Sequence, residues 1–188
     1  MISELVDTLL KARGIVDTER ERFLEPDYAR DTHDPFLFAD MDRAVDRLLA
    51  AIAKGERIAI YADFDCDGIP AAVVLHDVLK KIGYDNFEVY IPHRHNEGYG
   101  FHTQAIDALA SRGVSLIVTV DVGTVAFNGV AHARSLGLDV IVTDHHEPGE
   151  QLPDAIVVNP KRASYPFPHL CGAAVAFKLA QALLTRGR

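Results

Sequence analysis

The stretch RIAIYADFDCDG, from Arg57 to Gly68, joins a short apolar run to three closely spaced aspartates. The run is apolar at consecutive positions, as in strands buried on both faces of a parallel sheet. Four later segments share this composition: FEVYIP, SLIVTVD, DVIVTDH and AIVVNP. The segments between them, AAVVLHDVLKKIG, HTQAIDALASRG and VAFNGVAHARSLG, each end in glycine, as helices often do. This alternation predicts an α/β fold with a mostly parallel five-stranded sheet and helices on both faces.

The first part of the chain has a different pattern. Residues 1–55 predict helices, the clearest of which repeats apolar side chains at helical spacing from Met41 to Ile52. The last apolar segment, GAAVAFKLAQALL, also predicts a helix. We therefore predict an N-terminal helical extension over residues 1–55 and an α/β domain over residues 56–188.

Composition narrows the class of protein. Of the 188 residues, 48% are hydrophobic and 24% are charged, which is typical of a globular domain. The apolar runs are far shorter than the roughly 20 residues of a membrane helix, and the amphipathic start MISELVDTLLKARG does not resemble a secretory signal. Cys66 and Cys171 do not have the CxxC spacing of a metal site. We expect a cytoplasmic protein with reduced thiols and no membrane partner.

The charge distribution bears on nucleic acid as a partner. The net charge of -8 argues against a broad phosphate-binding surface, because lysine and arginine supply most of that affinity. However, every acidic residue lies at or before Asp154, and only basic charges follow it. The acidic excess is therefore not uniform.

Three of the predicted strands lead into polar side chains. Asp63 begins DFDCDG, Asp121 ends SLIVTVD, and DVIVT is followed by Asp144, His145 and His146. Ligands of open α/β sheets bind outside the carboxyl ends of the strands. We therefore expect these side chains to meet in one crevice.

Clustered carboxylates raise one another's pKa unless a cation compensates their charge. Aspartates with one or two imidazoles suit Mn²⁺ or Mg²⁺ better than Zn²⁺. If DFDCD is extended, alternation points Asp63, Asp65 and Asp67 to one side, opposite Phe64 and Cys66. Three carboxylates on one side could share two metal ions about 3.5 to 4 Å apart, an arrangement that serves phosphoryl transfer.

Other interpretations of these residues remain open. DFDCDG could be a calcium loop, but position 12 of that loop, normally glutamate, is Val74. Asp121 could cap a helix, and His76, His132 and His169 suit surface or packing positions. His145 and His146 come directly after a predicted buried strand, where the fold itself does not require two imidazoles. Their position favours a ligand or catalytic role.

With these motifs, the chain resembles the DHH phosphoesterase family, named for a triplet that stands here as Asp144, His145 and His146. Within that family, four further segments resemble the single-stranded-DNA-specific exonucleases. They are DPFLFADMDRAVDRLLAAIAKGERIAIYADFDCDG, IPHRHNEGYGF, VTVDVG and NPKRASYPFPHLCGAAVAFKLA. The resemblance covers the chain from about Arg13 onward and identifies residues 56–188 as the phosphoesterase catalytic domain.

The resemblance implies roles for individual residues. One metal ion would be held by Asp63, Asp65 and Asp121, and the other by Asp67, Asp121 and His145. Asp144 would orient an imidazole in the catalytic apparatus, and His146 and Arg94 would meet the scissile phosphate. Substrate binding would also involve Tyr99, with Gly98 and Gly100 admitting the nucleic acid close to the backbone, although both glycines could simply serve the loop.

The resemblance also implies an activity, namely Mn²⁺- or Mg²⁺-dependent 5'-to-3' hydrolysis of single-stranded DNA in repair and recombination. Replication or repair proteins would be further partners. The family carries another aspartate beyond the GAAVAFKLA segment, whereas no acid follows Asp154 here, so the second metal site is expected to be incomplete and the downstream half absent. Two alternatives stay open: a phosphodiesterase for oligoribonucleotides or cyclic dinucleotides, and a non-catalytic domain that binds DNA or proteins.

Overall fold

A computed structural model describes residues 3–162 and 165–187. The chain forms two compact units, residues 1–34 and residues 35–188. The first unit contains the helices α1 (Glu4–Ala12), α2 (Asp17–Leu24) and α3 (Tyr28–Asp31). Ion pairs within this unit join Arg20 to Asp7 and Arg22 to Asp31.

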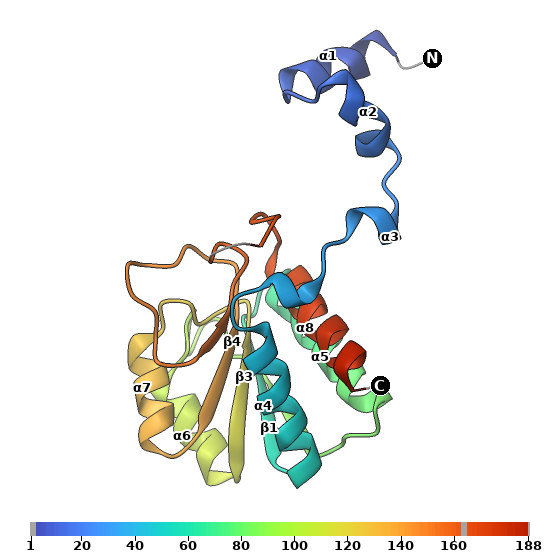
Figure 1. The fold of residues 1–188 in the computed structure, drawn as a ribbon. Coiled ribbons are helices and arrows are strands. Elements are labelled where there is room, and N and C mark those ends of the chain that lie inside the picture. The colour runs from blue at the N-terminus through green and yellow to red at the C-terminus, as the bar shows by residue number, and fades with distance from the viewer. Residues whose placement is uncertain (1–2, 163–164, 188) are drawn as a thin grey trace. The chain divides into compact units, whose positions relative to one another are not determined.

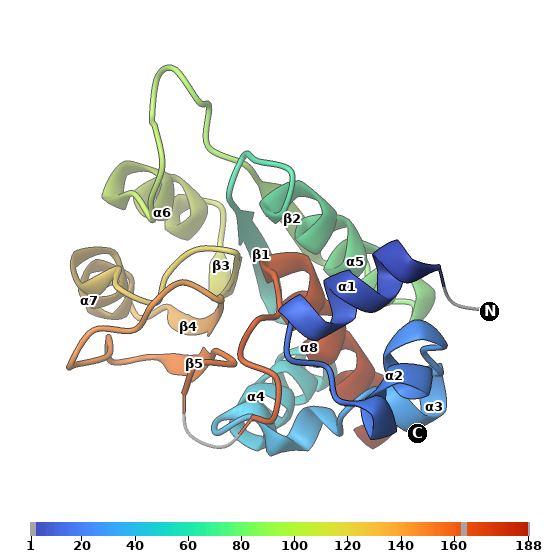
Figure 2. The same ribbon diagram turned by 90° about the horizontal axis from the view of Figure 1, so that it is seen from above.

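The second unit is built on a parallel sheet. Its strands are β1 (Arg57–Ala62), β2 (Phe87–Tyr90), β3 (Val114–Val120), β4 (Asp139–Thr143) and β5 (Ile156–Val158), in the order β2-β1-β3-β4-β5. Every neighbouring pair is parallel. β1, β3 and β4 lie side by side in the sheet (Figure 1). From β1 the chain crosses to β2 at one edge, and from β3 it proceeds through β4 to β5 at the other edge (Figure 2). The order therefore reverses beside β1 and β3, which is where ligands bind in open α/β sheets.

Helices cover both faces of the sheet, as Figure 2 shows from above. One face packs against α4 (Met41–Lys54), α5 (Gly68–Lys81) and α8 (Gly172–Arg186), and the other against α6 (Thr103–Ser111) and α7 (Phe127–Ser135). Along β1 the side chains alternate between two cores, Ile58 and Ile60 in the first and Ala59 and Tyr61 in the second. This arrangement explains why the strands are apolar at consecutive positions.

The predicted fold class is confirmed, including the five strands, the parallel sheet and the helices on both faces. The compact unit that contains the sheet begins at residue 35. The short helix η1 (Pro35–Leu37) and α4 belong to the unit of the sheet, where Met41, Val45 and Leu48 enter the core beside α8. Helical periodicity predicts an apolar face on α4 but does not say what that face packs against.

The start of α4 is also joined to the far edge of the sheet. Asp40, at the N-cap position, accepts hydrogen bonds from the backbone N–H of Val157 in β5, at 3.3 Å, and from Arg162, at 2.7 Å. The helix is thus fixed at its first residue. None of the helices in residues 3–162 and 165–187 combines the length and hydrophobicity needed to cross a bilayer.

Leu116 tests how far the packed sheet stabilises the domain. Its side chain in β3 is fully buried among residues of β1, α4 and α8. Leu116→Ala is expected to lower the free energy of unfolding by about 2 to 5 kcal/mol, because it removes buried methyl groups and leaves a cavity. Urea denaturation measures the change. Leu136→Ala, at a side chain that is 44% exposed, is the control and should change the stability by less than about 0.5 kcal/mol.

Candidate metal centre

The polar side chains of DFDCDG, VTVDVG and the DHH triplet meet at the carboxyl edge of the sheet. Asp63 directly follows β1, Asp121 follows β3 and Asp144 follows β4, and these strands are neighbours. The backbone N–H groups continue the sheet pairing by one residue, from Asp63 to Val120 at 3.3 Å and from Asp121 to Thr143 at 2.9 Å. The strand ladder itself therefore positions the aspartates.

The DFDCDG segment is a turn, and the prediction of an extended segment is wrong. The Oδ1 of Asp65 accepts hydrogen bonds from the backbone N–H groups of Asp67 and Gly68, both at 2.8 Å, which closes the turn into α5. A Cβ atom at Gly68 would lie 2.5 Å from the carbonyl oxygen of Asp63, so the turn requires glycine there. The hydrogen bonds that the Asp65 side chain accepts within the turn stabilise this conformation instead of an extended strand.

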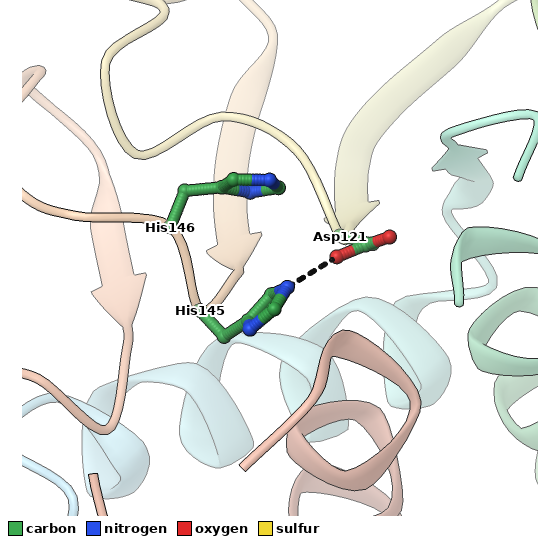
Figure 3. Close-up of side chains that lie close together, drawn as sticks. All are labelled: Asp121, His145 and His146. Atoms are coloured by element: carbon green, nitrogen blue, oxygen red, sulfur yellow. Dashed lines mark ion pairs between the residues drawn. The ribbon is translucent and has the colours of Figure 1, made fainter. Parts of the chain in front are cut away.

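Asp121 is the most constrained residue of the site. Its side chain is 1% exposed, and its φ of 62° is the single positive φ among the described residues other than glycine. Such backbone strain is concentrated at functional sites. The Nε2 of His145 lies 3.2 Å from its Oδ1, as the dashed line in Figure 3 marks. The alignment is not that of a hydrogen bond, so this buried oxygen accepts none within the described residues.

Burial raises the pKa of Asp121 to about 8, and the carboxylates of Asp67, Asp65, Asp144 and Asp63 add to the effect. Burial also raises the pKa of Asp63. In contrast, the backbone N–H of Gly68 holds the pKa of Asp65 below its usual value. The carboxyl groups of the site therefore cannot all ionise near neutral pH without a compensating charge, and a bound cation would supply that charge.

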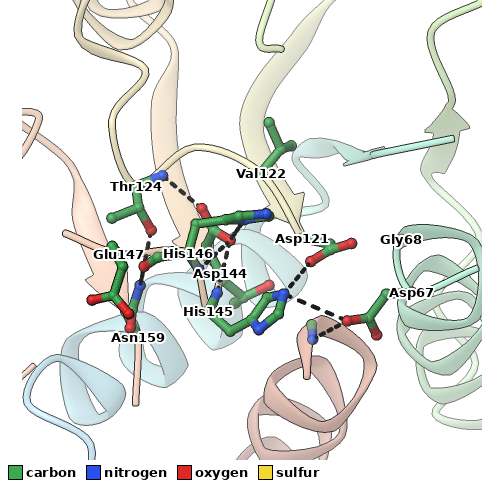
Figure 4. A network of polar contacts seen from close by, with 12 residues as sticks. Asp67, Gly68, Asp121, Val122, Thr124, Asp144, His145, His146, Glu147 and Asn159 are labelled. Carbon is green, nitrogen blue, oxygen red and sulfur yellow. Dashed lines mark hydrogen bonds and ion pairs between the residues drawn. The ribbon is translucent and has the colours of Figure 1, made fainter. Parts of the chain in front are cut away.

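The DHH triplet uses its aspartate to orient a histidine. Asp144 is 1% exposed, and its Oδ1 lies 2.7 Å from the Nδ1 of His146, while its Oδ2 accepts the backbone N–H of Thr124 at 2.8 Å (Figure 4). Burial alone would raise the pKa of Asp144, but these bonds, first that from Thr124, lower it. Because Nδ1 of His146 is engaged, its Nε2 is the ring nitrogen left to meet a ligand.

Asp67 lies at the first turn of α8. Its two carboxylate oxygens accept the backbone N–H groups of Gly172 and Ala173, each at 2.6 Å, and its Oδ2 is 3.6 Å from the Nε2 of His145. A carboxylate at a helix N-terminus is stabilised by both the free N–H groups and the helix dipole. Asp67 thus joins the first motif to a helix that begins more than a hundred residues later, and it also faces the histidine predicted to share its metal.

Two groups of side chains bring donor atoms close enough to hold a metal ion. The ligand atoms of Asp63, Asp65 and Asp121 lie within 4.8 Å of one another, as do those of Asp121, His145 and His146. The first is the predicted ligand set of one metal ion, and Asp121 belongs to both groups. The second includes His146, which the resemblance assigns to the phosphate, and omits Asp67, which α8 engages.

The EGYGF loop, residues 97–101, flanks the candidate metal centre. The guanidinium of Arg94 lies 4.3 Å from the ring centroid of Phe64, beside the first motif. The ring of Tyr99 meets that of His146 edge to face, with 5.9 Å between the centroids. Gly98 and Gly100 have φ values of 77° and 130°, which residues with a side chain rarely adopt. The structure thus brings every predicted site residue to the same edge of the sheet.

Two residues that support the site were not among the predicted site residues. Asn159, buried at the end of β5, donates hydrogen bonds to the Thr124 hydroxyl and the His146 carbonyl, both at 2.9 Å, and so supports the DHH loop. Tyr61 donates from β1 to the Gly100 carbonyl at 2.8 Å and fixes the EGYGF loop. The polar Asn159 directly after an apolar strand was the one available clue.

The structure bears on the alternative roles of Asp121 and of the three other histidines. Asp121 does not cap a helix, because α7 begins at Phe127 with Ala126 as its N-cap. His132 pairs with Asp107 and His76 with Asp77, each at a partly exposed position away from the site. His169 packs its ring against that of Phe167.

The fold and the site together define an α/β domain with a carboxylate and histidine centre at its topological switch point. Residues 57–188 match the family described as "DHH family, N-terminal domain". The chain therefore belongs to the DHH family.

Curated relatives and solved structures extend this result. The chain is 45% identical over 186 residues to the single-stranded-DNA-specific exonuclease RecJ of Bacillus subtilis, covering 97% of this chain and 24% of that protein. It is 41% identical to RecJ of Escherichia coli, covering 77% and 26%, respectively. It thus spans about a quarter of the length of these relatives.

Among solved structures, exonuclease RecJ bound to manganese superposes with a TM-score of 0.76 at 32% identity, covering 82% of this chain and 40% of that chain. RecJ in complex with Mn²⁺ from Thermus thermophilus superposes with a TM-score of 0.69 at 27% identity, covering 94% and 24%. Both similarities are to nucleases that were crystallised with a metal ion.

Gly172 tests the approach of α8 to the centre. A Cβ atom there would overlap the carboxylate of Asp121. Gly172→Ala is expected to displace either α8 or Asp121 and to weaken Mn²⁺ binding at least about tenfold, in the range that supporting contacts of a metal site contribute. Titration calorimetry measures the affinity. Gly149→Ala, where the nearest atom would be 3.6 Å away, is the control. Equal Mn²⁺ affinity in both variants would contradict the assignment.

Proposed function

We propose that this chain is the metal-binding part of a nuclease that hydrolyses phosphodiester bonds of single-stranded DNA from the 5' end. The observation that carries the proposal is the buried carboxylate of Asp121, shared between two groups of potential ligands and left with an oxygen that accepts no hydrogen bond within the described residues. The relatives named as single-stranded-DNA-specific exonucleases support the choice of substrate.

The residues present offer the full predicted ligand set for one divalent cation and part of the set for a second. Asp63, Asp65 and Asp121 would hold one, and Asp67, Asp121 and His145 the other, with the carboxylate and imidazole donors that Mn²⁺ and Mg²⁺ accept. Each carboxylate oxygen of Asp67 accepts one backbone N–H of α8, so Asp67 would offer a metal ion one of its remaining lone pairs. When bound, two such cations supply positive charge and Lewis acidity for phosphoryl transfer.

The chain's own side chains position the substrate. The Nδ1 of His146 would donate to the carboxylate of Asp144, which leaves Nε2 to face the phosphate. Nε2 is an acceptor in the neutral ring, so His146 would donate from it to a phosphate oxygen as the imidazolium. Arg94, whose guanidinium is spread over the Phe64 ring, would add a charged contact to the phosphate. Tyr99 and the open backbone at Gly98 and Gly100 would border the path of the strand.

The domain over residues 56–188 would be the catalytic half of the family architecture, and the remaining half would complete the second metal site. The cellular setting would be DNA repair and recombination in the cytoplasm, with replication or repair proteins as partners. These statements rest on the resemblance to the relatives named above.

Asp121→Asn tests the proposal directly. Loss of the shared carboxylate is expected to reduce both Mn²⁺ affinity and nucleotide release from 5'-labelled single-stranded DNA by more than the roughly 10- to 100-fold that a supporting residue contributes. The assays use the chain alone and the chain mixed with the downstream part of a relative. Asp107→Asn, an ion-paired acid near α7, is the control.

The outcomes separate the alternatives. Absence of Mn²⁺ binding by the unsubstituted chain would exclude a metal-dependent nuclease. Faster turnover of a dinucleotide than of a long strand would favour a small-substrate phosphodiesterase instead.

Asp144→Asn separates orientation from metal binding. The amide cannot accept the hydrogen bonds of both oxygens, so the imidazole of His146 loses its fixed tautomer. We expect cleavage to slow by about 10- to 100-fold, while Mn²⁺ affinity changes far less. Steady-state kinetics and calorimetry on the same preparation distinguish the two effects. A parallel loss of affinity and rate would show that Asp144 instead supports the metal ligands.

A further inference from the structure

A hollow of about 450 Å³ lies beside the candidate metal centre. It is enclosed by the EGYGF loop on one side and by the segment from Val122 to Gly129 on the other. His146 and Asp144 form part of its wall, so it opens next to the imidazole proposed to meet the phosphate. Any group attached to that phosphate therefore has this hollow within reach.

The lining of the hollow is mainly apolar and aromatic. The side chains of Tyr99, Val125 and Phe127 are 54%, 57% and 41% exposed, although they are large and apolar. Asn128 is exposed beside them, and its amide makes no hydrogen bond within the described part of the chain. Exposed rings with a free polar group nearby are what a flat, polar-edged heterocycle requires.

The fold keeps this hollow open through close backbone contacts. A Cβ atom at Gly129 would lie 2.5 Å from the carbonyl oxygen of Phe101, so the first turn of α7 rests directly against the EGYGF loop. The buried ring of Phe101 also packs edge to face on Tyr61 of β1, with 4.9 Å between the centroids. Both walls are therefore fixed to the same sheet that carries Asp63 and Asp121.

We infer that this hollow binds the nucleobase of the nucleotide whose phosphate meets His146, with Phe127 and Tyr99 as its contact surfaces. The inference rests on the proposed function and adds a base-binding subsite to it. A base can enter only when it is unpaired and unstacked, so the subsite would select for single-stranded substrate at the position of cleavage. Stacking on a ring is tolerant of sequence, because every base has a π-face.

The test compares two ligands that differ only in the base, 2'-deoxyadenosine 5'-monophosphate and 2-deoxyribose 5-phosphate. In the presence of Mn²⁺, the nucleotide is expected to bind about tenfold more tightly, within the range measured for base stacking on one aromatic side chain. Titration calorimetry on the full chain gives both affinities. Phe127→Ala removes one of the two proposed contact surfaces, so it should remove most of this difference and leave the affinity for the sugar phosphate unchanged.

Leu136→Ala, an exposed residue that follows the same helix, is the matched control and should keep the tenfold difference. Val125→Ser provides a second substitution in the lining, and it should reduce the difference in the same direction. Equal binding of both ligands by the unsubstituted chain, or a difference that survives Phe127→Ala, would overturn the base subsite while leaving the proposed function intact. Binding of neither ligand would overturn both.

Discussion

The structure is organised around carboxyl groups that crowd together at one edge of a parallel sheet. The carboxylate of Asp121 is buried in a strained backbone conformation, with its pKa raised to about 8 by burial and by neighbouring acids. A buried acceptor without a hydrogen bond lowers the stability of the fold by about 1 to 3 kcal/mol. A ligand that binds this oxygen would offset that loss. The charge thus points to the same cation that the donor set fits.

Contacts from α8 and from the last strand hold that edge of the sheet in place. Gly172 allows α8 to touch the carboxylate of Asp121, and Asp67 fixes the first turn of α8 with both oxygens. Asn159 secures the DHH loop from the last strand. Consequently, four segments that are distant in the sequence are held around one small volume. In the proposed nuclease, this would orient a phosphate relative to the metal ions.

The sequence was sufficient for the sheet and for the position of the site. Runs of Val and Ile apolar at consecutive positions specify buried parallel strands, and the carboxyl ends of such strands lie at one edge, so Asp63, Asp121 and Asp144 had to meet. The same reasoning wrongly predicted that DFDCDG is extended, whereas the segment forms a turn. Whether Asp65 caps its own turn or extends a strand depends on local hydrogen bonds that alternation alone does not weigh.

The periodicity of apolar residues does not predict which elements contact one another in the folded domain. The pairing of Asp67 with the first turn of α8 depends on how that helix docks, and nothing in DFDCDG specifies it. Likewise, the stripe from Met41 to Ile52 predicted a helix without indicating that it packs beside α8 in the unit of the sheet. Local patterns encode elements, while tertiary packing decides which element covers which face.

The structure also shows that basic residues near the end of the chain form ion pairs within the domain. In sequence they offset the acidic excess, but Lys161 pairs with Glu147 at 2.7 Å, Arg162 with Asp40 at 2.7 Å, and Arg186 with Asp46 at 2.7 Å. These charges are therefore engaged in holding loops and helices together. In the proposed nuclease, phosphate affinity would then come from the metal ions, from Arg94 beside the first motif, and from contacts that do not depend on charge. An aromatic hollow next to His146 supplies contacts of that last kind, which makes a base-binding subsite physically consistent with a net charge of -8.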